Sequence, residues 1–420
     1  MKIHLDLDSF FISAERIRNL ALRNIPAAVG GRGDPFIFDS KEQSKISLLQ
    51  KGQGAFIPSV FYNSDTTFEN YFVEGSKIRG IVITSSYEAR KYGIKTGMSI
   101  REALSLCPHL VVVPPNHLYY HELSSKLHKF LQKRIPIVEQ FSIDEFFGDL
   151  SGYVKDEEVE KFLQTLQKEI MERFTLPISI GAAQSKWTAK LATSFAKPRG
   201  VKVVREVEPF IKDIPIEKFP GIGRGYLRRL RNYGIKTLGQ TKEIQDIFQS
   251  WKLPGQILYK RIWGIDEEPV ESGIVRKSIG ISRTIDPISN REEIRRRIII
   301  LARHLATSVA KIGFEPRFYG LSIRYEQGVR SKAHRLLHSR CNEMLIKNVM
   351  LELFQECDKL ATQSIVRLSI RCANEQKKRT YNLLDHQKDE RFAKLTDSAL
   401  KIRSKYGMDS LKWGIELYSK

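Results

Sequence analysis

The sequence predicts an α+β fold divided into several domains. Strand-like and helix-like stretches follow one another irregularly through the first half of the chain, which is typical of α+β proteins. The length of 420 residues, 41% of them hydrophobic, is sufficient for several buried cores. Short helical stretches with Gly and Pro between them, at 209–263, separate this half from a second group of strands.

The first half begins with a strand and a helix. KIHLDLD (2–8) alternates apolar and polar residues, so it predicts a strand with Asp6 and Asp8 on one face. A helical stretch at 9–24 follows, with Ser9 as its expected N-cap. The later elements expected in this half are a hairpin at 138–153, a strand at 176–185 and a helix at 186–197.

The second half predicts a separate unit of strands and helices. ESGIVRKSIG (271–280) is expected to be an extended linker that leads into this unit. The elements expected after it are strands at 318–327 and 364–373, helices at 291–310 and 345–360, and a charged, mostly helical tail from about 375.

The charge of the chain indicates a polyanionic partner. The net charge is +21 and the isoelectric point is near 9.7, which favours nucleic acid first and an anionic membrane second. Residues 276–340 contain fifteen Lys and Arg against five Asp and Glu, so about a sixth of the chain carries nearly half of the net charge. This concentration predicts a domain dedicated to binding phosphates.

Other classes of protein are disfavoured. Acidic residues interrupt the apolar N-terminal stretch, so it does not resemble a secretory signal, and no run of eighteen apolar residues predicts a membrane span. The four cysteines show no CxxC spacing, so we expect neither a structural zinc site nor a disulfide framework. A reducing, cytoplasmic location fits this composition.

Two neighbouring acids stand out in FSIDEFF (141–147). Asp144 and Glu145 would repel each other, and burying either carboxylate without compensation is costly. A sheet could bring them to Asp6, which would place three carboxylates around one or two hard cations. Adjacent strand residues point to opposite faces, so both acids reach one site only if the backbone bends there. A solvent-exposed acidic hairpin is the alternative that the spacing leaves open.

The residues around these acids resemble a known family. HLDLDSFF, SSYEARKYGIKTGM, FSIDEFF and SFAKPRG occur in the order and approximate spacing of the Y-family DNA polymerases. These are translesion enzymes related to bacterial DNA polymerase IV and the ImpB/MucB/SamB group. The resemblance continues through FPGIGRGYLRRLRNYGI and VRKSIGISRT, and it covers roughly 1–33 and 81–376.

The resemblance implies a right-hand polymerase fold with a palm, fingers, a helical thumb containing a helix-hairpin-helix, and a C-terminal α/β little finger. The implied domains are the palm at 1–10 and 117–205, the fingers at 11–116, the thumb at 206–271, the linker at 272–277, the little finger at 278–376 and a C-terminal tail at 377–420.

The resemblance also implies a two-metal catalytic site. Asp6, Asp144 and Glu145 match the metal-binding carboxylates of the family, and the backbone carbonyl of Leu7 would add a ligand. Asp8 matches an acid with a structural role. The implied cofactor is Mg²⁺, two ions bound together with a deoxynucleoside triphosphate. One ion lowers the pKa of the primer 3′-hydroxyl and the other stabilises the pyrophosphate leaving group.

Residues that contact the incoming nucleotide are implied in the same way. Tyr87, Arg90 and Lys197 match residues that bind the triphosphate, for which Arg offers a fork of donors and Lys a point charge. Phe11 matches the steric gate, an aromatic ring under the sugar that excludes a 2′-hydroxyl, whereas its neighbour Phe10 is expected in the core. Lys190 is expected at the surface, as a weaker phosphate or DNA candidate.

Two regions are expected to hold DNA. In PGIGRGYLRRL the helix-hairpin-helix turn would bring backbone N–H groups and basic side chains to a phosphate without reading sequence. The candidate residues in this turn are Gly221, Gly223, Arg224 and Arg228. In the little finger, the candidate phosphate contacts are Arg276, Lys277, Ser278, Arg283, Arg330 and Arg335. A solvated basic face is an equally open interpretation for each of these six.

Three segments depart from the family pattern. Residues 34–80 form an apparent insertion in the fingers, and its aromatic residues argue against simple disorder. A packed subdomain, a lid and a partner surface are the alternatives for it. AQSKWTAK departs from the commoner S-x-N-K form, so Ala183 and Ser185 receive no site role. Near the C-terminus, Tyr381, Leu383 and Leu384 lie where relatives often carry a sliding-clamp motif, with a linker or helix-packing role as the alternative.

The function implied is template-directed, Mg²⁺-dependent DNA synthesis of the translesion type. We expect low fidelity and no proofreading exonuclease, since no second acidic cluster is set out between the matched motifs. The expected partners are primer–template DNA, deoxynucleoside triphosphates and the sliding clamp, with no membrane, and the protein is expected to be a monomer. The alternative is a DNA-damage binding protein with an inactive polymerase fold. A nucleotidyl cyclase is disfavoured by the helix-hairpin-helix and the basic domain.

Overall fold

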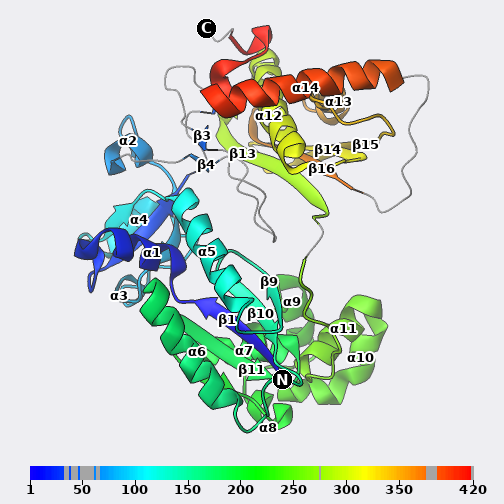
Figure 1. Ribbon diagram of the computed structural model, residues 1–420. Coiled ribbons are helices and arrows are strands. Elements are labelled where there is room, and N and C mark those ends of the chain that lie inside the picture. Colours follow the sequence, from blue (N-terminus) through cyan, green and yellow to red (C-terminus); the bar gives the residue numbers. More distant parts are fainter. Residues whose placement is uncertain are drawn as a thin grey trace.

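The computed structural model describes residues 1–32, 37–38, 46–47, 61–62, 67–273, 276–374 and 386–417. Strands and helices are mixed along the chain, and they form an N-terminal half and a C-terminal domain that lie one above the other in Figure 1. No helix among the described residues combines the length and apolar character that a membrane span requires.

A five-stranded sheet forms the centre of the N-terminal half. Its strand order is β12-β11-β1-β10-β9, and β1 is antiparallel to both of its neighbours. These strands are β1 (Lys2–Leu7), β9 (Ile137–Gln140), β10 (Glu145–Asp149), β11 (Ile178–Ala183) and β12 (Val201–Val203). Alternation along β1 sends Ile3, Leu5 and Leu7 into the main core, which leaves His4 and Asp6 on the other face.

Different helices cover the two faces of this sheet. α5 (His117–Leu131) and α6 (Val159–Phe174) share the main core with Ile3 and Leu5. α7 (Lys186–Ala196) lies against β11 and β1 on the opposite face. Gly181 permits this close approach, because a Cβ atom there would lie 2.3 Å from the carbonyl oxygen of Ala189. Helix α7 therefore covers the face of the sheet on which Asp6 lies.

A smaller sheet lies beside α1 (Phe10–Arg18), with the strand order β7-β2-β8. Its core includes Tyr71 and Phe72, two aromatic residues of the predicted insertion. Phe56 of that insertion lies outside the described residues. The elements that form or adjoin this sheet are β2 (Ala27–Gly31), α2 (Phe68–Phe72), β5 (Val73–Glu74), β6 (Lys77–Ile78), β7 (Ile81–Ser85), α3 (Tyr87–Arg90), α4 (Ile100–Leu106) and β8 (Val111–Val113). A separate two-stranded sheet is formed by β3 (Ile46–Ser47) and β4 (Phe61–Tyr62).

A helical unit completes the N-terminal half. It has its own hydrophobic core, in which Leu191 of α7 also takes part. The helices are α8 (Val207–Ile211), α9 (Arg224–Asn232), α10 (Gln245–Ser250) and α11 (Lys252–Ile262). After α11 the chain returns to the central sheet, where the Glu271 N–H donates a 3.0 Å hydrogen bond to Oε2 of Glu139.

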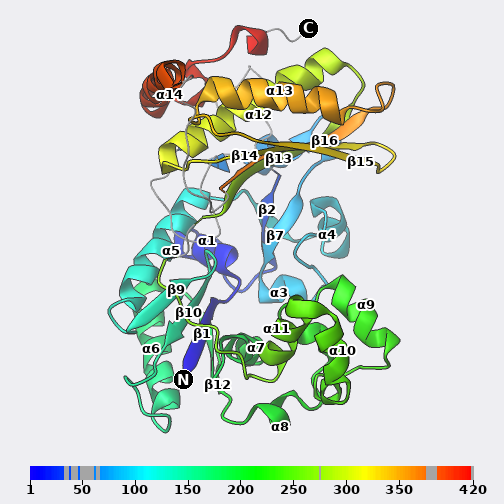
Figure 2. The same cartoon turned by 90° about the vertical axis from the view of Figure 1, so that its right-hand side faces the viewer.

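The C-terminal domain is a four-stranded antiparallel sheet of order β13-β16-β14-β15. Figure 2 shows α12 and α13 on one face of this sheet, and the other face turned towards the N-terminal half. Along β14, Tyr319, Leu321 and Ile323 alternate into the core beneath these helices. The elements are β13 (Ser278–Ile288), α12 (Arg291–Ile312), β14 (Phe318–Tyr325), β15 (Arg330–Leu336), α13 (Glu343–Cys357), β16 (Ile365–Ala373) and α14 (His386–Tyr406).

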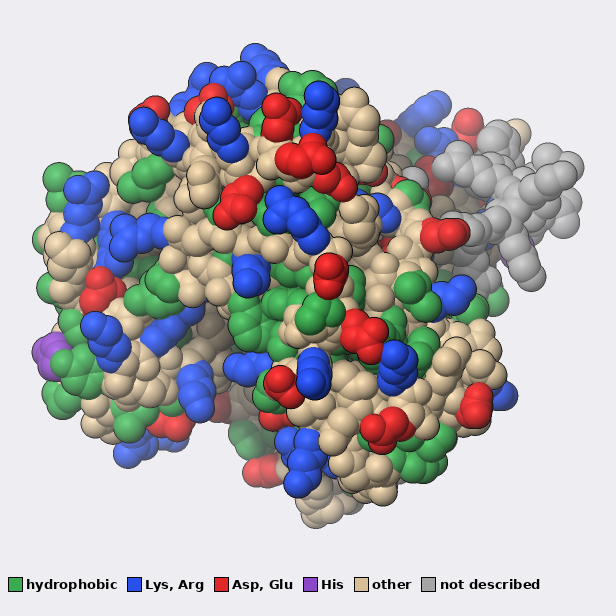
Figure 3. Space-filling view, turned by 90° about the horizontal axis from the view of Figure 1, so that it is seen from below, with side chains coloured by type: hydrophobic (Ala, Val, Ile, Leu, Met, Phe, Trp, Pro, Cys, Tyr) green, Lys and Arg blue, Asp and Glu red, His purple; other side chains and the backbone are tan. Residues whose placement is uncertain are grey.

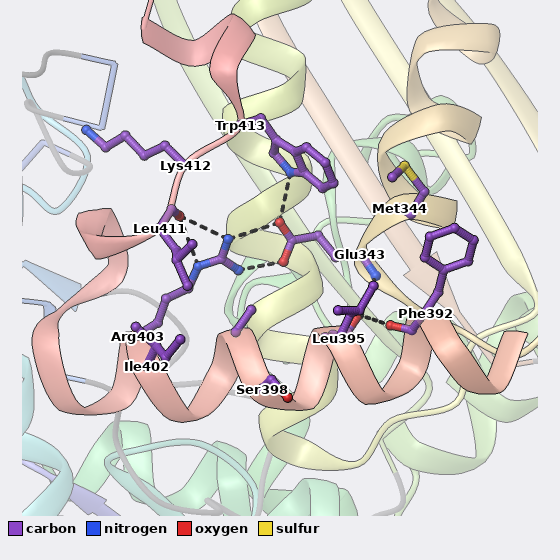
Figure 4. Close-up of a pocket in the computed structure, with 12 residues that line it drawn as sticks. Glu343, Met344, Phe392, Leu395, Ser398, Ile402, Arg403, Leu411, Lys412 and Trp413 are labelled. Carbon is purple, nitrogen blue, oxygen red and sulfur yellow. Dashed lines mark hydrogen bonds and ion pairs between the residues drawn. The ribbon is translucent and has the colours of Figure 1, made fainter. Parts of the chain in front are cut away.

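The end of the chain is held to this domain by buried ion pairs. Arg403 of α14 binds both carboxylate oxygens of Glu343, at 2.5 and 3.0 Å. The indole N–H of Trp413 donates to the same carboxylate at 2.8 Å (Figure 4). A mainly apolar pocket of about 360 Å³ lies beside this cluster, between α14 and the residues that follow it. The helical character predicted for the tail is present at 386–406.

Candidate active site

A bend in the chain brings the two neighbouring acids to one place. Residues 142–144 form this bend, and β10 starts only at Glu145, so Asp144 escapes the alternation of a regular strand. Asp6 pairs directly with Glu145 in the β1–β10 register. The Leu7 N–H donates a 3.0 Å hydrogen bond to the carbonyl of Asp144. The three acids predicted to act together are therefore neighbours at the end of β1.

Two lysines neutralise these carboxylates. Lys197 Nζ lies 2.5 Å from Oδ1 of Asp6, and Lys190 forms an ion pair with Oε1 of Glu145. The expectation that Lys190 lies at the surface was wrong: its side chain is 17% exposed, because α7 turns it towards the sheet. Within the described ranges, no group of three or more His, Cys, Asp or Glu side chains is gathered closely enough to hold a metal ion.

The acids nevertheless suit a divalent cation. Burial raises the pKa of Asp6 to about 7; Lys197 opposes this rise, and the charges of Asp144 and Glu145 add to it. Burial also raises the pKa of Asp144, against the effect of its hydrogen bond from Ser142. Burial therefore disfavours the charged form of both acids, and a bound cation would offset this effect. Carboxylate oxygens are hard ligands, so the chemistry of these side chains, although not their present spacing, suits a divalent cation.

Asp8 has the structural role that the sequence predicted. Its side chain is 1% exposed and accepts hydrogen bonds from Ser179 Oγ at 3.0 and 2.9 Å and from the Arg199 N–H at 2.8 Å. The Tyr87 hydroxyl donates a further bond of 3.1 Å to it. Asp8 thus connects the central sheet to α3, on which Arg90 places its guanidinium 4.7 Å from the Tyr87 ring centre.

The predicted triphosphate contacts are consequently assembled around the acids. The Tyr87 hydroxyl donates a hydrogen bond to Asp8, and the Arg90 guanidinium lies over the Tyr87 ring. Lys197 forms an ion pair with Asp6. Burial raises the pKa of Tyr87, and the Asp8 charge adds to that rise, so the hydroxyl remains a hydrogen-bond donor. Arg90 is exposed and Lys197 is 30% exposed, so both can reach an anion that enters from solvent.

Phe11 lies in the first turn of α1, and its ring stacks on Tyr120 of α5. Phe10 is buried, as expected for a core residue. Ser9 precedes α1 as predicted, but its side chain makes no capping bond, because the residue adopts a left-handed conformation with φ of 48°. The sequence did not single out Tyr120, which is indistinguishable from a core aromatic residue on an amphipathic helix.

Family models match both halves of the chain. The model described as the impB/mucB/samB family matches residues 5–194, and the model of that family's C-terminal domain matches 276–383. This chain belongs to the impB/mucB/samB family. The resemblance inferred from the motifs is confirmed.

Similar proteins support the same assignment. DNA polymerase IV of Streptococcus pneumoniae serotype 4 is 28% identical over 364 residues, which cover 85% of this chain and 92% of that protein. DNA polymerase IV of Yersinia pestis is 28% identical over 338 residues, covering 79% and 82%. The family and these relatives identify the chain as a DNA-directed DNA polymerase of the translesion type.

Solved structures share the fold. A Y-family DNA polymerase chimera, Dbh-Dpo4(243-245)-Dbh, aligns with a TM-score of 0.70 at 22% identity, covering 90% of this chain and 99% of that one. An insertion ternary complex of Dbh DNA polymerase aligns with a TM-score of 0.56 at 22% identity, covering 89% and 98%. The right-hand fold with palm, thumb and little finger is confirmed.

In this family member, the thumb presents the predicted glycine turn. Gly221 adopts a φ of 104°, which favours glycine, and Gly223 caps the start of α9. Arg224 and Arg228 on α9 are exposed. The structure therefore places all four predicted thumb residues at the surface or in the turn itself, where a phosphate could approach the backbone.

The little-finger sheet separates the predicted DNA contacts onto two faces. Arg283 pairs in register with Leu368 of the core, and Arg335 pairs with the buried Tyr319. Both arginines therefore share the helix-covered face, and Arg335 forms ion pairs with Glu352 and Glu356 of α13. Both residues were candidate phosphate contacts, but alternation along their strands turns their side chains away from the open face of the sheet.

The open face carries a different set of basic residues. Arg371 lies opposite Gly280 and Gly320 in the sheet, and Arg367 lies opposite Arg324. Of the predicted residues, Ser278 and Arg330 share this face, while the half-buried Arg276 and the exposed Lys277 lie just before β13. The basic residues of the open face are Arg324, Arg330, Lys332, Arg367 and Arg371.

Other surfaces are weaker candidates. On the side of the molecule shown in Figure 3, Lys and Arg side chains are interspersed with Asp and Glu rather than gathered in one patch. The pocket of Figure 4 is lined mainly by apolar side chains of the little-finger side, away from the acids. The proposed clamp residues Tyr381, Leu383 and Leu384 lie outside the described residues.

Proposed function

We propose that this chain extends a DNA primer by metal-assisted transfer of deoxynucleotides at Asp6, Asp144 and Glu145. The observation that carries the proposal is the β1–β10 register, which sets Asp6 against Glu145 with Asp144 in the adjoining bend. Three acids from two distant stretches meet at a desolvated position where the pKa of Asp6 rises to about 7. A purely structural site would be expected to avoid this accumulation of negative charge.

A divalent metal cofactor follows from the family, and the finer assignment is two Mg²⁺ ions held by the three carboxylates and the Leu7 carbonyl. When bound, the metal lowers the pKa of the attacking 3′-hydroxyl and stabilises the leaving pyrophosphate. Lys190 and Lys197 would then exchange their present carboxylate partners for other groups. Lys197, which is 30% exposed, is positioned to turn from Asp6 to a phosphate oxygen.

The remaining residues orient the nucleotide. Tyr87 and Arg90 lie on one short helix that Asp8 ties to the central sheet, so they would hold the triphosphate in a fixed relation to the acids. Phe11 would lie under the sugar and exclude a 2′-hydroxyl. Its ring has little freedom to retreat, because Tyr120 stacks on it. Positioning of this kind is the main contribution of a protein to phosphoryl transfer.

The DNA would be held by its backbone at two places. The glycine turn before α9 offers N–H groups to a phosphate, and the open face of the little-finger sheet offers Arg367 and Arg371. Arg276 and Lys277 would extend this face towards the linker. We also propose that the domains have the limits inferred from the sequence, that the protein is a monomer and that it contacts the sliding clamp. Nothing in the described residues favours the alternative of an inactive, DNA-damage binding protein.

Primer extension tests the proposal. The chain should extend an undamaged primer in short runs with Mg²⁺, and Asp144→Ala–Glu145→Ala should slow extension about a thousandfold or more, because metal-supplied charge stabilisation is worth several kcal/mol. Asp149→Ala, at the other end of β10, is the matched control and should extend normally. Extension by the double variant at the parent rate would contradict the proposal. Failure of the parent to extend, with DNA binding equal in both proteins, would favour the binding-only alternative.

A further inference from the structure

One short segment of the fingers is built into the core of another domain. Ile37 lies between β2 and α2, whose residues pack in the cores of the N-terminal half. Its own side chain is 8% exposed and belongs instead to the hydrophobic core of the little finger, together with Ile294 and Ile298 of α12. A residue of the predicted insertion therefore crosses from one half of the molecule to the other.

Phe38 strengthens the same contact in two ways. Its carbonyl oxygen accepts a 3.1 Å hydrogen bond from Nη2 of Arg296, and its ring lies 4.6 Å from the guanidinium carbon of Arg297. Arg296 is only 6% exposed and also donates to the carbonyl oxygen of Glu416 at 3.3 Å. One buried guanidinium thus binds the fingers segment and the end of the chain at once.

A second contact between the halves is more exposed. Arg79, just before β7, binds the carboxylate of Asp286 on β13 at 3.0 and 3.2 Å. These side chains are 37% and 67% exposed, so this pair contributes little on its own. Burial of Ile37 is the stronger effect, and it would shift the ratio of docked to undocked molecules by about ten- to a hundredfold.

We propose that Ile37 and Phe38 form a docking segment that fastens the fingers to the little finger and so prolongs each encounter with DNA. The covalent connection between the halves leaves the palm at Glu271, where its N–H is bound to Glu139. The docking segment adds a buried attachment at α12 of the little finger, in addition to the exposed Arg79–Asp286 pair. The part concerning DNA rests on the proposed function.

The physical reason is effective concentration. The thumb turn and the open face of the little finger both bind the DNA backbone, and a phosphate released by one is recaptured sooner if the other stays in place. A little finger attached through the linker alone could turn away from the palm. A second, apolar attachment restricts that motion, so both binding surfaces remain directed at the same duplex.

The docking itself is tested without DNA. Ile37→Asp–Phe38→Ala would place a charge in the apolar contact and remove the ring that lies against Arg297, and small-angle X-ray scattering of the full chain should then show a larger radius of gyration. Leu20→Asp is the matched control, because Leu20 is 61% exposed in the same half and its replacement buries nothing. Arg297→Ala, which removes the guanidinium over Phe38 together with its ion pair to Glu293 on the same helix, should give a smaller change in the same direction. An unchanged scattering curve for the double variant, with an unchanged melting temperature, would overturn the docking.

The consequence for DNA is tested on the same variants. The Ile37→Asp–Phe38→Ala chain should release primer–template about tenfold faster and copy fewer nucleotides per encounter when excess trap DNA prevents rebinding. Equal run lengths, or longer ones, would overturn this consequence even if the scattering had changed. If the parent chain copies no DNA at all, the proposed function fails, and the scattering result still decides whether the segment docks.

Discussion

The ring of Tyr120 lies nearly parallel to the ring of Phe11, with 4.4 Å between their centroids and 14° between their planes. The hydroxyl of Tyr120 donates a 2.6 Å hydrogen bond to Oε1 of Glu15, which lies on the same helix as Phe11. Burial raises the pKa of Tyr120, and the Glu15 charge adds to the rise, so the hydroxyl remains protonated. The position of the proposed sugar-selecting ring is therefore set by a residue of another helix.

Sugar selection should depend on both residues. Phe11→Ala should raise the kcat/KM ratio of ribonucleotides to deoxynucleotides by about ten- to a hundredfold. The reason is that the ring that would collide with the 2′-hydroxyl is removed. Tyr120→Leu should raise the ratio less, because the Phe11 ring remains but loses its support. Tyr120→Phe keeps the stack and should change the ratio little. An unchanged ratio in Phe11→Ala would refute the steric-gate role.

The two faces of the little-finger sheet should differ in DNA binding. Arg367→Ala and Arg371→Ala, on the open face, should each weaken binding to any sequence and reduce the salt slope of log K by about 0.9 for each phosphate that is no longer neutralised. Arg335→Ala is the control on the other face, where Glu352 and Glu356 already bind it, and its salt slope should equal that of the parent. Fluorescence anisotropy at several salt concentrations measures these slopes. A larger effect for Arg335→Ala than for the open-face variants would show that DNA binds the other side.

The buried ion pair of α14 should be important for stability. Arg403→Met leaves the carboxylate of Glu343 buried without its cation, which should cost about 3–5 kcal/mol in the free energy of unfolding. Arg295→Met removes a comparable Arg–Glu pair whose side chains are 41% and 74% exposed, and it should cost less than about 1 kcal/mol. Denaturant unfolding followed by circular dichroism measures both. Equal effects would mean that the end of the chain contributes little to this domain.

Acid should destabilise the little finger through His304. Its imidazole is 1% exposed, and neither ring nitrogen has a hydrogen-bond partner among the residues described. Burial lowers its pKa well below 6.5, and the charges of Arg303 and Arg283 lower it further. The folded state therefore holds His304 neutral, whereas the unfolded state binds a proton below pH 6.5.

The stability that His304 contributes as a neutral group is thus present above its unfolded pKa and is lost as the pH falls. Between pH 6.5 and 5, protonation of His304 in the unfolded state should lower the free energy of unfolding by about 1.4 kcal/mol per pH unit. His304→Leu removes the group, so unfolding curves of the parent and the variant should run parallel above pH 7 and diverge below it. Parallel curves down to pH 5 would show that His304 is protonated in the folded state.

Much of the site could be predicted because its residues occur in short, ordered motifs. The acids of FSIDEFF, the YEAR helix and the AKPRG lysine are each recognisable from neighbouring residues, and the requirement for a bend at Asp144 followed from strand geometry alone. The position of Arg283 could have been predicted too. It follows Ile279 and Ile281 at intervals of two residues, so alternation already assigns it to their buried face.

Other positions could not be obtained in this way. RSKAHRL contains too few apolar residues for its alternation to show which face Arg335 shares, and the register with Tyr319 decides the matter. The sequence around Lys190 predicts an exposed lysine. Only the packing of α7 against the central sheet brings this side chain to Glu145. Nothing in the sequence around Ile37 indicates that its partner lies more than 250 residues away on α12.

The sequence by itself determined the family, the identity of the acids and the basic character of the little finger, because these depend on residue type and local order. The tertiary structure decided which basic residues lie on the open face of the little-finger sheet, which lysines neutralise the acids and which segment joins the fingers to the little finger. Periodicity shows which residues share a face of a strand or helix. The element that covers that face is determined by packing between distant parts of the chain, and no local pattern records it.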